Sequence, residues 1–270
     1  MDMKDLTIGI KGAGEMASAV AWRLYMANFR KIFMLELPAP LAVRREVSYC
    51  ESLFEGRKTI EGVEGVKAEG PEEVPRIWES GKIAVISDPQ WQSLKAIKPH
   101  VLIDALLAKK NLGTHREDAP LVIGLGPGFE ADKDVDFVIE TNRGHHLGRI
   151  ITKGAAESNT GIPGPIAGHT KDRVLRAPDA GKFLSHVNIG DRVKAGNIIG
   201  FVADEPVHAQ IDGVLRGLIR SNTPVSKGLK IGDIDPRGEV EYCHTISEKA
   251  RAISGSALEV ILRVYHGQSV

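Results

Sequence analysis

The sequence predicts an α/β protein in which a doubly wound parallel sheet is followed by a small all-β domain. Short apolar strands alternate with helical stretches in the first half, and from residue 174 the chain changes to short strands separated by turns. A length of 270 residues also favours two domains over one large core. We therefore expect an α/β domain over 1–165, a β domain over 174–236, and a helical segment over 237–270 that packs back.

The composition excludes several classes of protein. Lys and Arg number 35, as do Asp and Glu, so the chain is neutral and lacks the positive charge of a general nucleic-acid binder. No apolar run is long enough to span a membrane, and the N-terminus enters a strand directly instead of a signal sequence. The two cysteines form no disulfide framework. These features predict a cytoplasmic protein that binds neither nucleic acid nor membrane.

The strands of the α/β domain are apolar on both faces, as in a parallel sheet covered by helices. A helix is expected over 15–27, where apolar residues recur at helical spacing, and the piece from 56 to 80 is expected to form a hairpin and a helix. The predicted strands are 6–10, 32–36, 83–87, 101–104, 121–124 and 135–139.

A glycine-rich turn follows the first strand and matches G-x-G-x-x-A, as in Rossmann-like dinucleotide-binding domains. Gly12 permits the tight turn, Gly14 lets the backbone approach a pyrophosphate, and Ala17 allows close packing of the helix. Glu36 ends the second strand, where an acidic residue would bind ribose hydroxyls. The alternative is a turn that serves packing and holds no nucleotide, and Glu15 places a carboxylate beside the expected anion.

Polar groups also follow the later strands, whose carboxyl ends line one crevice in an open parallel sheet. Glycine turns, amides and guanidinium groups suit an anionic ligand, although the same segments could be solvated loops. His145 and His146 are adjacent, so they would not point at one centre, and we predict no metal site. The candidate ligand residues here are Asp104, Lys109, Gly126, Gly128, Asn142, Arg143 and His145.

The second half contains an internal repeat. An offset of 32 residues pairs Ala177 with Ala209 and Gly181 with Gly213, and four further positions match at the same offset. Two such units closing on each other predict a small barrel-sandwich, and residues 174–236 resemble the biotinyl/lipoyl carrier fold. That fold attaches its cofactor to a lysine between the two copies. The corresponding hairpin, 202–207, contains no lysine, so we expect no covalent biotin or lipoate and favour an interaction or scaffold module.

The last segment returns to helix. Ser247 could begin a helix whose apolar stripe needs a partner, either the first domain or a second copy of the chain in a homo-oligomer. Cys50 and Cys243 are the only thiols and hence the only candidates for a catalytic thiolate. For both, the simpler reading is a buried structural cysteine.

Seven segments spread over the chain carry one shared resemblance: 12–14, 36–45, 104–109, 124–129, 140–149, 159–164 and 242–256. Together they resemble the YqeB family, which is associated with maturation of selenium-dependent molybdenum hydroxylases. The first domain also resembles the Rossmann half of XdhC-type chaperones.

The resemblance implies a cytoplasmic maturation factor or chaperone that handles the molybdenum cofactor. Its ligand would be a molybdopterin dinucleotide or another nucleotide in the crevice, and its partners a client molybdenum hydroxylase or other maturation proteins. Two alternatives stay open: an NAD(P)-dependent oxidoreductase, and a non-catalytic scaffold with an empty Rossmann fold. The sequence does not decide between enzyme and chaperone, or between selenium and sulfur.

Overall fold

The computed structural model describes residues 3–266 and divides into two compact units. Unit 1 comprises 1–40, 48–159 and 246–270, and unit 2 comprises 41–47 and 160–245. Each unit is described by itself. In the described residues, no helix is both long enough and apolar enough to cross a membrane.

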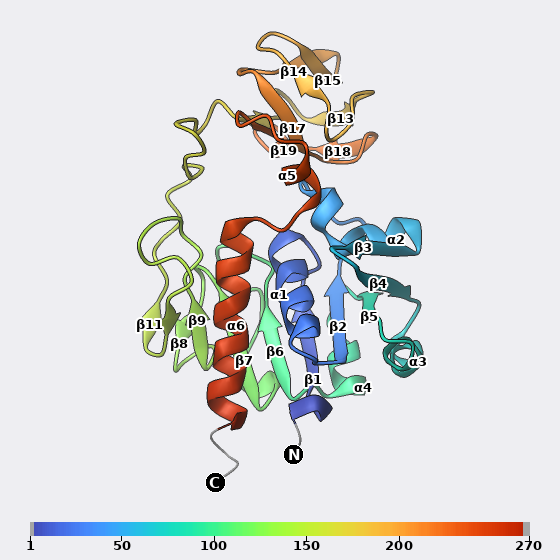
Figure 1. Cartoon of the computed structure of the whole chain (residues 1–270), viewed down its shortest axis with the longest axis vertical. Helices are drawn as coiled ribbons and strands as arrows, with labels where there is room; N and C mark the ends of the chain where they lie inside the picture. The colour runs from blue at the N-terminus through green and yellow to red at the C-terminus, as the bar shows by residue number, and fades with distance from the viewer. Residues whose placement is uncertain (1–2, 267–270) are drawn as a thin grey trace. The chain divides into compact units, whose positions relative to one another are not determined.

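Unit 1 is built on a nine-stranded sheet with the order β10-β9-β7-β6-β1-β2-β5-β4-β3 (Figure 1). The strands from β9 to β4 run parallel, whereas β10 and β3 pair antiparallel at the two edges. A two-stranded sheet joins β11 to β8. The strands are β1 (Thr7–Lys11), β2 (Lys31–Glu36), β3 (Arg57–Ile60), β4 (Val63–Ala68), β5 (Ile83–Ser87), β6 (Val101–Asp104), β7 (Leu121–Leu125), β8 (Glu130–Ala131), β9 (Phe137–Ile139), β10 (Ile150–Ile151) and β11 (Gly154–Ala155).

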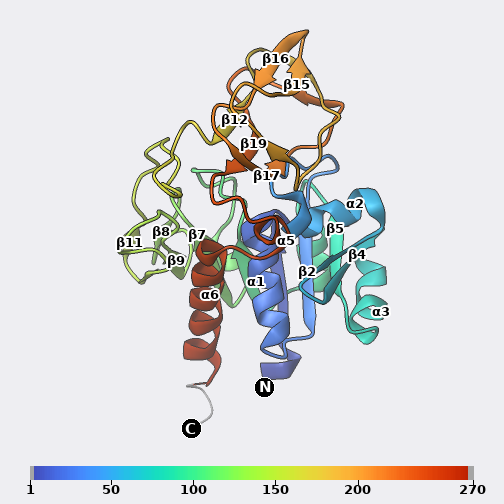
Figure 2. The same cartoon turned by 45° about the horizontal axis from the view of Figure 1, so that its top comes forward.

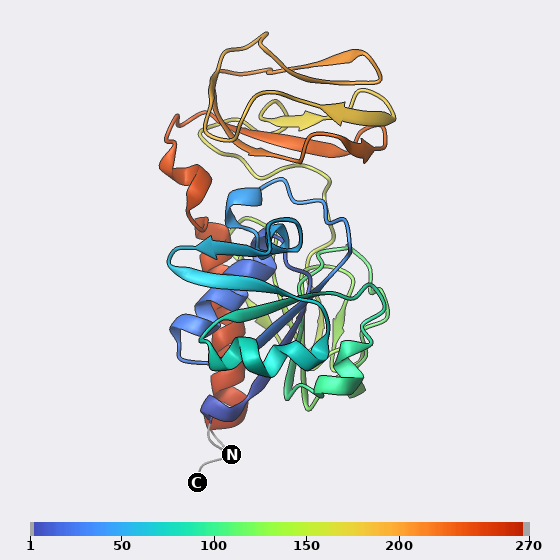
Figure 3. The ribbon, with the colours of Figure 1, turned by 90° about the vertical axis from the view of Figure 1, so that its right-hand side faces the viewer.

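Helices cover both faces of this sheet unevenly. The helix α1 (Glu15–Met26) packs against the C-terminal helix α6 (Glu248–His266) on one face, and α3 (Val74–Glu79) and α4 (Ser93–Ile97) lie on the other (Figure 3). The apolar stripe of α6 is buried at Ile253, Ala257 and Ile261. The remaining helical turns of unit 1 are η1 (Met3–Asp5), η3 (Tyr49–Glu51), α2 (Ser52–Glu55), η4 (Pro71–Glu73) and η5 (Arg116–Asp118).

The individual elements are confirmed, but the predicted fold class is wrong. The main sheet is mixed, and no α-helix occurs between β6 and β7 or between β7 and β9 in the described structure, so the sheet is not doubly wound in the Rossmann manner. Turn chemistry explains the first gap. The side chain of Asn111 accepts hydrogen bonds from the N–H groups of Gly113 and Thr114, which holds this connection as a loop.

Unit 2 contains two four-stranded antiparallel sheets, β12-β19-β17-β14 and β16-β15-β13-β18, which share one apolar core (Figure 2). No ladder joins the two sheets, so they do not close into the small barrel that the sequence predicted, and the expected biotinyl/lipoyl-like barrel-sandwich is corrected to two separate sheets packed on one core. The elements are η2 (Arg45–Val47), β12 (Val174–Arg176), β13 (Gly181–Leu184), β14 (Arg192–Val193), β15 (Ile198–Val202), β16 (Glu205–His208), β17 (Gly213–Leu218), β18 (Thr223–Val225), β19 (Lys230–Asp235) and α5 (Glu241–His244).

The internal repeat is confirmed by the strand order. The offset of 32 residues makes β12 equivalent to β16, β13 to β17, β14 to β18 and β15 to β19. Exchanging the two copies converts the order β12-β19-β17-β14 into β16-β15-β13-β18, which is the order of the second sheet. Each sheet therefore takes two strands from each copy, so neither copy can form a complete sheet without the other.

Candidate functional site

The glycine turn after β1 adopts the geometry that the sequence predicted, but its neighbours are acidic. Gly12 has a φ of 97°, and an added Cβ at Gly14 would meet nothing within 4 Å. Glu36 is nearly buried, and its carboxylate accepts hydrogen bonds from the N–H groups of Ala13 (2.8 Å) and Leu37 (2.8 Å). Burial raises the pKa of Glu36, and these two N–H groups lower it less than burial raises it.

A second carboxylate stands at the start of α1. Glu15 accepts a hydrogen bond from the hydroxyl of Ser247 (2.9 Å). A pyrophosphate at this helix terminus would gain from the backbone N–H groups but would meet the charges of Glu15 and Glu36. The turn has open space in front of Gly14, but its electrostatics oppose a polyanion.

Asp104 lies in a buried polar network at the end of β6. Its carboxylate accepts hydrogen bonds from the hydroxyl of Thr114 (2.6 Å) and the N–H of Leu106 (3.1 Å). Burial raises the pKa of Asp104 more than the hydroxyl of Thr114, the N–H of Leu106 and the charge of Lys11 lower it. The predicted Asp104 is therefore one end of a chain of contacts that continues through Thr114 to Lys11.

The glycines of the loop after β7 are needed for close packing. A Cβ on Gly126 would lie 2.5 Å from Oγ1 of Thr141, and a Cβ on Gly128 would lie 2.6 Å from the backbone of Lys110. Gly128 has a φ of 111°, which a residue with a Cβ rarely adopts. Lys109 is exposed and has a φ of 63°.

The loop after β9 holds three of the predicted ligand residues. The first makes a hydrogen bond and the second an ion pair within unit 1. Asn142 donates from Nδ2 to Glu157 (2.6 Å), and Arg143 pairs with Glu248 at the start of α6 (2.6 Å). His145 is exposed, and its ring stacks edge-on against that of His146. In residues 3–266 no group of three or more His, Cys, Asp and Glu side chains is arranged to hold a metal ion.

Both thiols are buried, and they lie in different units. Cys50 and Cys243 have no exposed surface. The Sγ of Cys243 lies 3.8 Å from the carbonyl oxygen of Leu215. Burial raises the pKa of this thiol by more than the charges of Arg44 and Arg216 lower it. Neither thiol has the access that a nucleophile needs, and the raised pKa of Cys243 also disfavours its thiolate.

We expect both cysteines of the folded protein to resist iodoacetamide at pH 8. Cys243 should react more slowly than a free thiol by a factor of at least about 100, because the thiolate is disfavoured and the reagent has no access. Mass spectrometry after timed quenching, with the urea-unfolded chain as the control, measures this. Rapid alkylation of Cys243 before unfolding would contradict the burial.

The structure reveals a site that the sequence analysis missed. Lys11 is the last residue of β1 and is only 1% exposed, yet it is one of the residues that line a cavity of 840 Å³ on the α4 face of the sheet. Its ammonium donates to Thr114 Oγ1 (2.7 Å) and lies 3.4 Å from Asp118 and 5.4 Å from the ring centre of Trp91. The only sequence feature that could have indicated it is a lysine at the end of a buried strand.

The cavity, here called the Lys11 groove, exists because no helix covers this part of the sheet. It runs between α4 on one side and the loop from β6 to β7 on the other, and Trp91, Lys95, Lys98 and His100 contribute to its walls. The carboxylate of Asp88 fixes the loop that carries Trp91 by accepting hydrogen bonds from the N–H groups of Ser93 and Gln90.

Two residues of the groove have strained backbone conformations. Trp91 has a φ of 58° and Lys98 a φ of 52°, both in the left-handed region. A bulky aromatic residue rarely adopts this conformation, and such strain is concentrated at binding sites and active sites. His100 accepts the N–H of Thr7 at Nδ1 (3.0 Å), so the proton of its neutral ring lies on Nε2.

Comparison with known proteins gives one sequence relative. The chain is 47% identical over 257 residues to the "Uncharacterized protein YqeB" of Escherichia coli (strain K12), a match that covers 95% of this chain. The chain spans about half the length of this relative, of which 47% is covered. No family model matches the chain.

Solved structures give only distant similarities. A succinylglutamate desuccinylase/aspartoacylase from Rhodobacter sphaeroides is 18% identical, with 32% of this chain and 30% of that chain covered and a TM-score of 0.22. An aspartoacylase family protein from Mesorhizobium loti is 12% identical, with coverage of 75% and 56% and a TM-score of 0.25. The ectoine utilization protein EutE (DoeB) from Ruegeria pomeroyi is 13% identical, with coverage of 85% and 57% and a TM-score of 0.23.

These findings overturn the function expected from the resemblance. The sequence relative has no assigned function, and the main sheet is not the Rossmann sheet that the resemblance to XdhC-type chaperones implied. The expected roles as a maturation factor or chaperone for selenium-dependent molybdenum hydroxylases are therefore withdrawn, and so is the NAD(P)-dependent oxidoreductase. The buried thiols give a physical reason, because transfer of sulfur or selenium would require an accessible thiolate.

Proposed function

We propose that unit 1 binds a small anionic molecule with a flat ring system, a nucleotide or a nucleotide-like compound, in the Lys11 groove. The observation that carries this proposal is the buried side chain of Lys11, a cation among the residues that line an 840 Å³ cavity. Ligand cavities in proteins commonly enclose about 300–1,000 Å³. A buried cation is costly unless it is paired, and Asp118 pairs with it only from a partly exposed position.

The walls of the groove supply both kinds of contact that such a ligand needs. The indole of Trp91 offers a flat apolar face, and the ammonium groups of Lys95 and Lys98 are exposed along the same cavity. Aromatic stacking of a base contributes about 1–3 kcal/mol. The groove therefore combines a stacking surface with three lysines, although Glu117 and Asp118 also line it and Asp118 pairs with Lys11. The glycine turn has no lysine of this kind and combines backbone N–H groups with the carboxylates of Glu15 and Glu36.

One end of the groove lies where ligands bind in open α/β sheets, because Lys11 ends β1, whereas Pro99, His100 and Pro120 line the groove at the amino ends of β6 and β7. In the sheet, β1 lies between β2, which follows it in the chain, and β6, which comes much later. Lys11 of β1 is paired in register with Asp104 of β6. Crevices form at the carboxyl ends of strands where the chain order diverges in this way. The position of Lys11 supports a ligand that reaches this end of the groove.

Calorimetry and thermal shift with AMP, CTP, NAD and NADP test the proposal on the full chain. We expect at least one of these nucleotides to raise the midpoint of unfolding in a concentration-dependent way. Trp91→Leu should weaken its binding by about 5- to 150-fold, as expected for loss of base stacking. Lys11→Met should abolish binding, and Lys95→Gln should weaken it, whereas Lys153→Gln, an exposed lysine outside the groove, should leave it unchanged.

Gly14→Val distinguishes the groove from the glycine turn. If the ligand occupies the groove, this variant keeps its affinity, because Gly14 is not among the residues that line the cavity. Binding that Gly14→Val abolishes and Trp91→Leu leaves intact would overturn the proposal, as would the absence of any nucleotide binding. Circular dichroism of each variant shows whether a loss of affinity reflects a loss of folding.

A further inference from the structure

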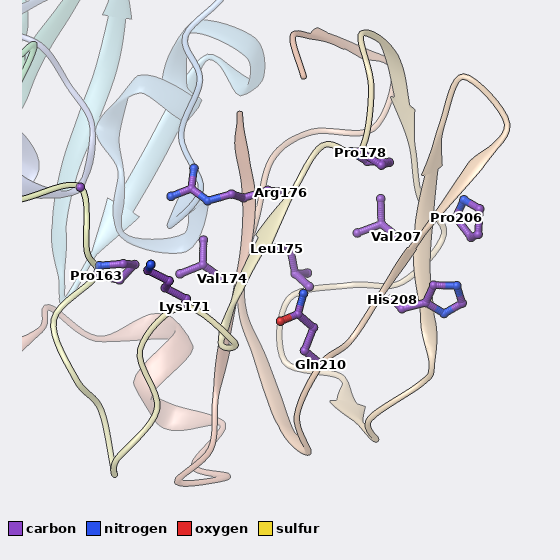
Figure 4. Close-up of a pocket in the computed structure, with 11 residues that line it drawn as sticks. Pro163, Lys171, Val174, Leu175, Arg176, Pro178, Pro206, Val207, His208 and Gln210 are labelled. Carbon is purple, nitrogen blue, oxygen red and sulfur yellow. The ribbon is translucent and has the colours of Figure 1, made fainter. Parts of the chain in front are cut away.

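Two cavities differ in how their charged groups are placed. A cavity of 630 Å³ in unit 2 lies between β12 and β16, and Figure 4 shows Arg176 and His208 pointing to opposite outer sides of it. Residues of the apolar core separate these two basic groups, so one ligand cannot contact both. In the Lys11 groove, by contrast, the ammonium of Lys11 lies 3.4 Å from the carboxylate of Asp118, and both residues line the same cavity. One ligand can therefore meet both of these charges.

The ammonium of Lys11 has two polar partners at unequal distances. It donates to Oγ1 of Thr114 at 2.7 Å, whereas Oδ2 of Asp118 lies 3.4 Å away. Charge-assisted hydrogen bonds between an ammonium and a carboxylate usually measure about 2.7–2.9 Å. Asp118 is therefore a loose counter-ion, and a ligand oxygen can approach Lys11 more closely than Asp118 does.

The carboxylate of Asp118 also has interactions that do not depend on Lys11. Its Oδ2 accepts a hydrogen bond from the N–H of His115 (3.1 Å), which is part of the capping box of η5. The side chain of Asp118 is 28% exposed, whereas that of Lys11 is 1% exposed. Asp118 can therefore leave Lys11 at a small cost in free energy, because water and the N–H of His115 still stabilise its charge.

Lys11 is held in position without Asp118. The hydroxyl of Thr114 donates to Asp104 (2.6 Å), which leaves a lone pair of this oxygen for the ammonium of Lys11. The side chain of Asn111 fixes the backbone of Thr114, since it accepts from its N–H (2.8 Å) and donates to its carbonyl oxygen (2.8 Å). The buried ammonium thus stays at one point of the groove and offers its other N–H groups to a ligand.

We propose that Asp118 occupies, in the ligand-free protein, the place of a ligand's terminal phosphate, and that a phosphate monoester displaces it from Lys11. This inference rests on the proposed binding of a nucleotide-like anion in the Lys11 groove. A monoanion that replaced Asp118 would exchange one negative charge for another. A phosphate monoester carries about 1.5–2 negative charges at pH 7 and three acceptor oxygens, so it gains from the exchange. Asp118 thereby makes the groove select phosphate monoesters over phosphate diesters and carboxylates.

AMP and cyclic AMP test this selection, because they share the base and the sugar but carry a phosphate monoester and a phosphate diester, respectively. In calorimetry on the full chain, AMP should bind at least about tenfold more tightly, the effect of one additional charge-assisted contact. Asp118→Asn removes the competing charge and keeps an oxygen for the N–H of His115, so it should tighten the binding of AMP by roughly 3- to 10-fold. Glu117→Gln, which removes the neighbouring exposed carboxylate of the same groove, is the matched control and should change this affinity by less than about twofold.

Inorganic phosphate is a second probe, and its binding does not depend on a base. Without ligand, Asp118→Asn should lower the midpoint of thermal unfolding, because the buried ammonium of Lys11 loses its counter-ion. Phosphate should raise the midpoint of Asp118→Asn more than that of the wild type, and this difference should vanish when Lys11→Met is combined with Asp118→Asn. A merely structural role of Asp118 predicts the lower midpoint without the larger response to phosphate.

The outcomes separate this inference from the proposed function. If AMP binds the wild type, then equal affinity for cyclic AMP, or unchanged or weaker binding of AMP in Asp118→Asn, overturns the inference and leaves the proposed function standing. A gain in Glu117→Gln as large as that in Asp118→Asn overturns it as well, because the effect would then be one of general charge. If AMP does not bind, the response to phosphate decides the inference by itself: a larger response in Asp118→Asn supports it, and equal responses overturn it.

Discussion

Asp233→Asn is expected to lower the free energy of unfolding of unit 2 by about 3–5 kcal/mol, the usual effect of breaking a buried ion pair from one side. Asp233 is 1% exposed in β19 and pairs with Arg173, with Arg216 (2.9 Å) and with Lys230 (3.3 Å). The neighbouring Asp235 pairs with Arg216 (3.2 Å) and Arg237 (2.6 Å). Removing the charge of Asp233 leaves buried guanidinium groups without full compensation.

The same network predicts a pH dependence. Burial opposes ionisation of Asp233, but the charges of Lys230, Arg216 and Arg173 outweigh it and hold its pKa below the ordinary value. A carboxyl whose pKa is lowered by folding contributes stability above its unfolded pKa, about 3.9, and loses it as the pH falls through the folded pKa. Unit 2 should therefore lose stability below about pH 4, and the loss should be shallower in Asp233→Asn.

Hydrogen exchange measured by mass spectrometry on peptides from β17 and β19 reports the stability of unit 2. All three tryptophans lie in unit 1, so tryptophan fluorescence during urea unfolding reports unit 1 separately and serves as an internal control. Asp204→Asn, at an exposed turn, is the matched variant and should change stability by less than about 0.5 kcal/mol. Equal protection of β19 in the wild type and Asp233→Asn would contradict the assigned role of the ion pairs.

Gly128→Ala is expected to destabilise unit 1 by about 2–5 kcal/mol, the sum of backbone strain and overpacking. Gly128 has a φ of 111°, and the new methyl group would lie 2.6 Å from the backbone of Lys110, which cannot move aside as a side chain can. The substitution should therefore lower the free energy of unfolding, because Gly128 is needed for close packing against Lys110.

Gly62→Ala separates the two causes. Gly62 has a φ of 83°, but an added Cβ there would meet nothing within 4 Å, so this variant carries the strain without the clash. Urea unfolding followed by tryptophan fluorescence should show a smaller loss, about 1–2 kcal/mol, for Gly62→Ala. Equal losses in the two variants would show that the contact with Lys110 relaxes at little cost.

Much of the local structure could be predicted from the sequence. The parallel strands of the main sheet, the helices α1, α3 and α6, the glycine turn at Gly12 and the repeat of unit 2 are encoded by periodicity, turn residues or spacing along the chain. The short elements α2, α4, β8, β10 and β11 were not predicted. The candidate site was predicted only in part. Asp104 does belong to a buried polar network, in which the hydroxyl of Thr114 contacts both Asp104 and Lys11. Lys11 was not predicted, because a single lysine in a strand forms no distinctive sequence pattern.

The sequence by itself determined the order of the elements and the equivalence of the two copies in unit 2, because both depend on neighbouring residues or on a fixed offset. Only the tertiary structure decided which face of the sheet stays uncovered, which thiols are buried, and which charges meet. Lys11 and Thr114 lie 103 residues apart and Arg173 and Asp233 lie 60 apart, yet both pairs are in contact. Such contacts depend on the strand order and on the free-energy cost of burying an unpaired charge. Neither of these produces a periodic pattern in the sequence that could be recognised beforehand.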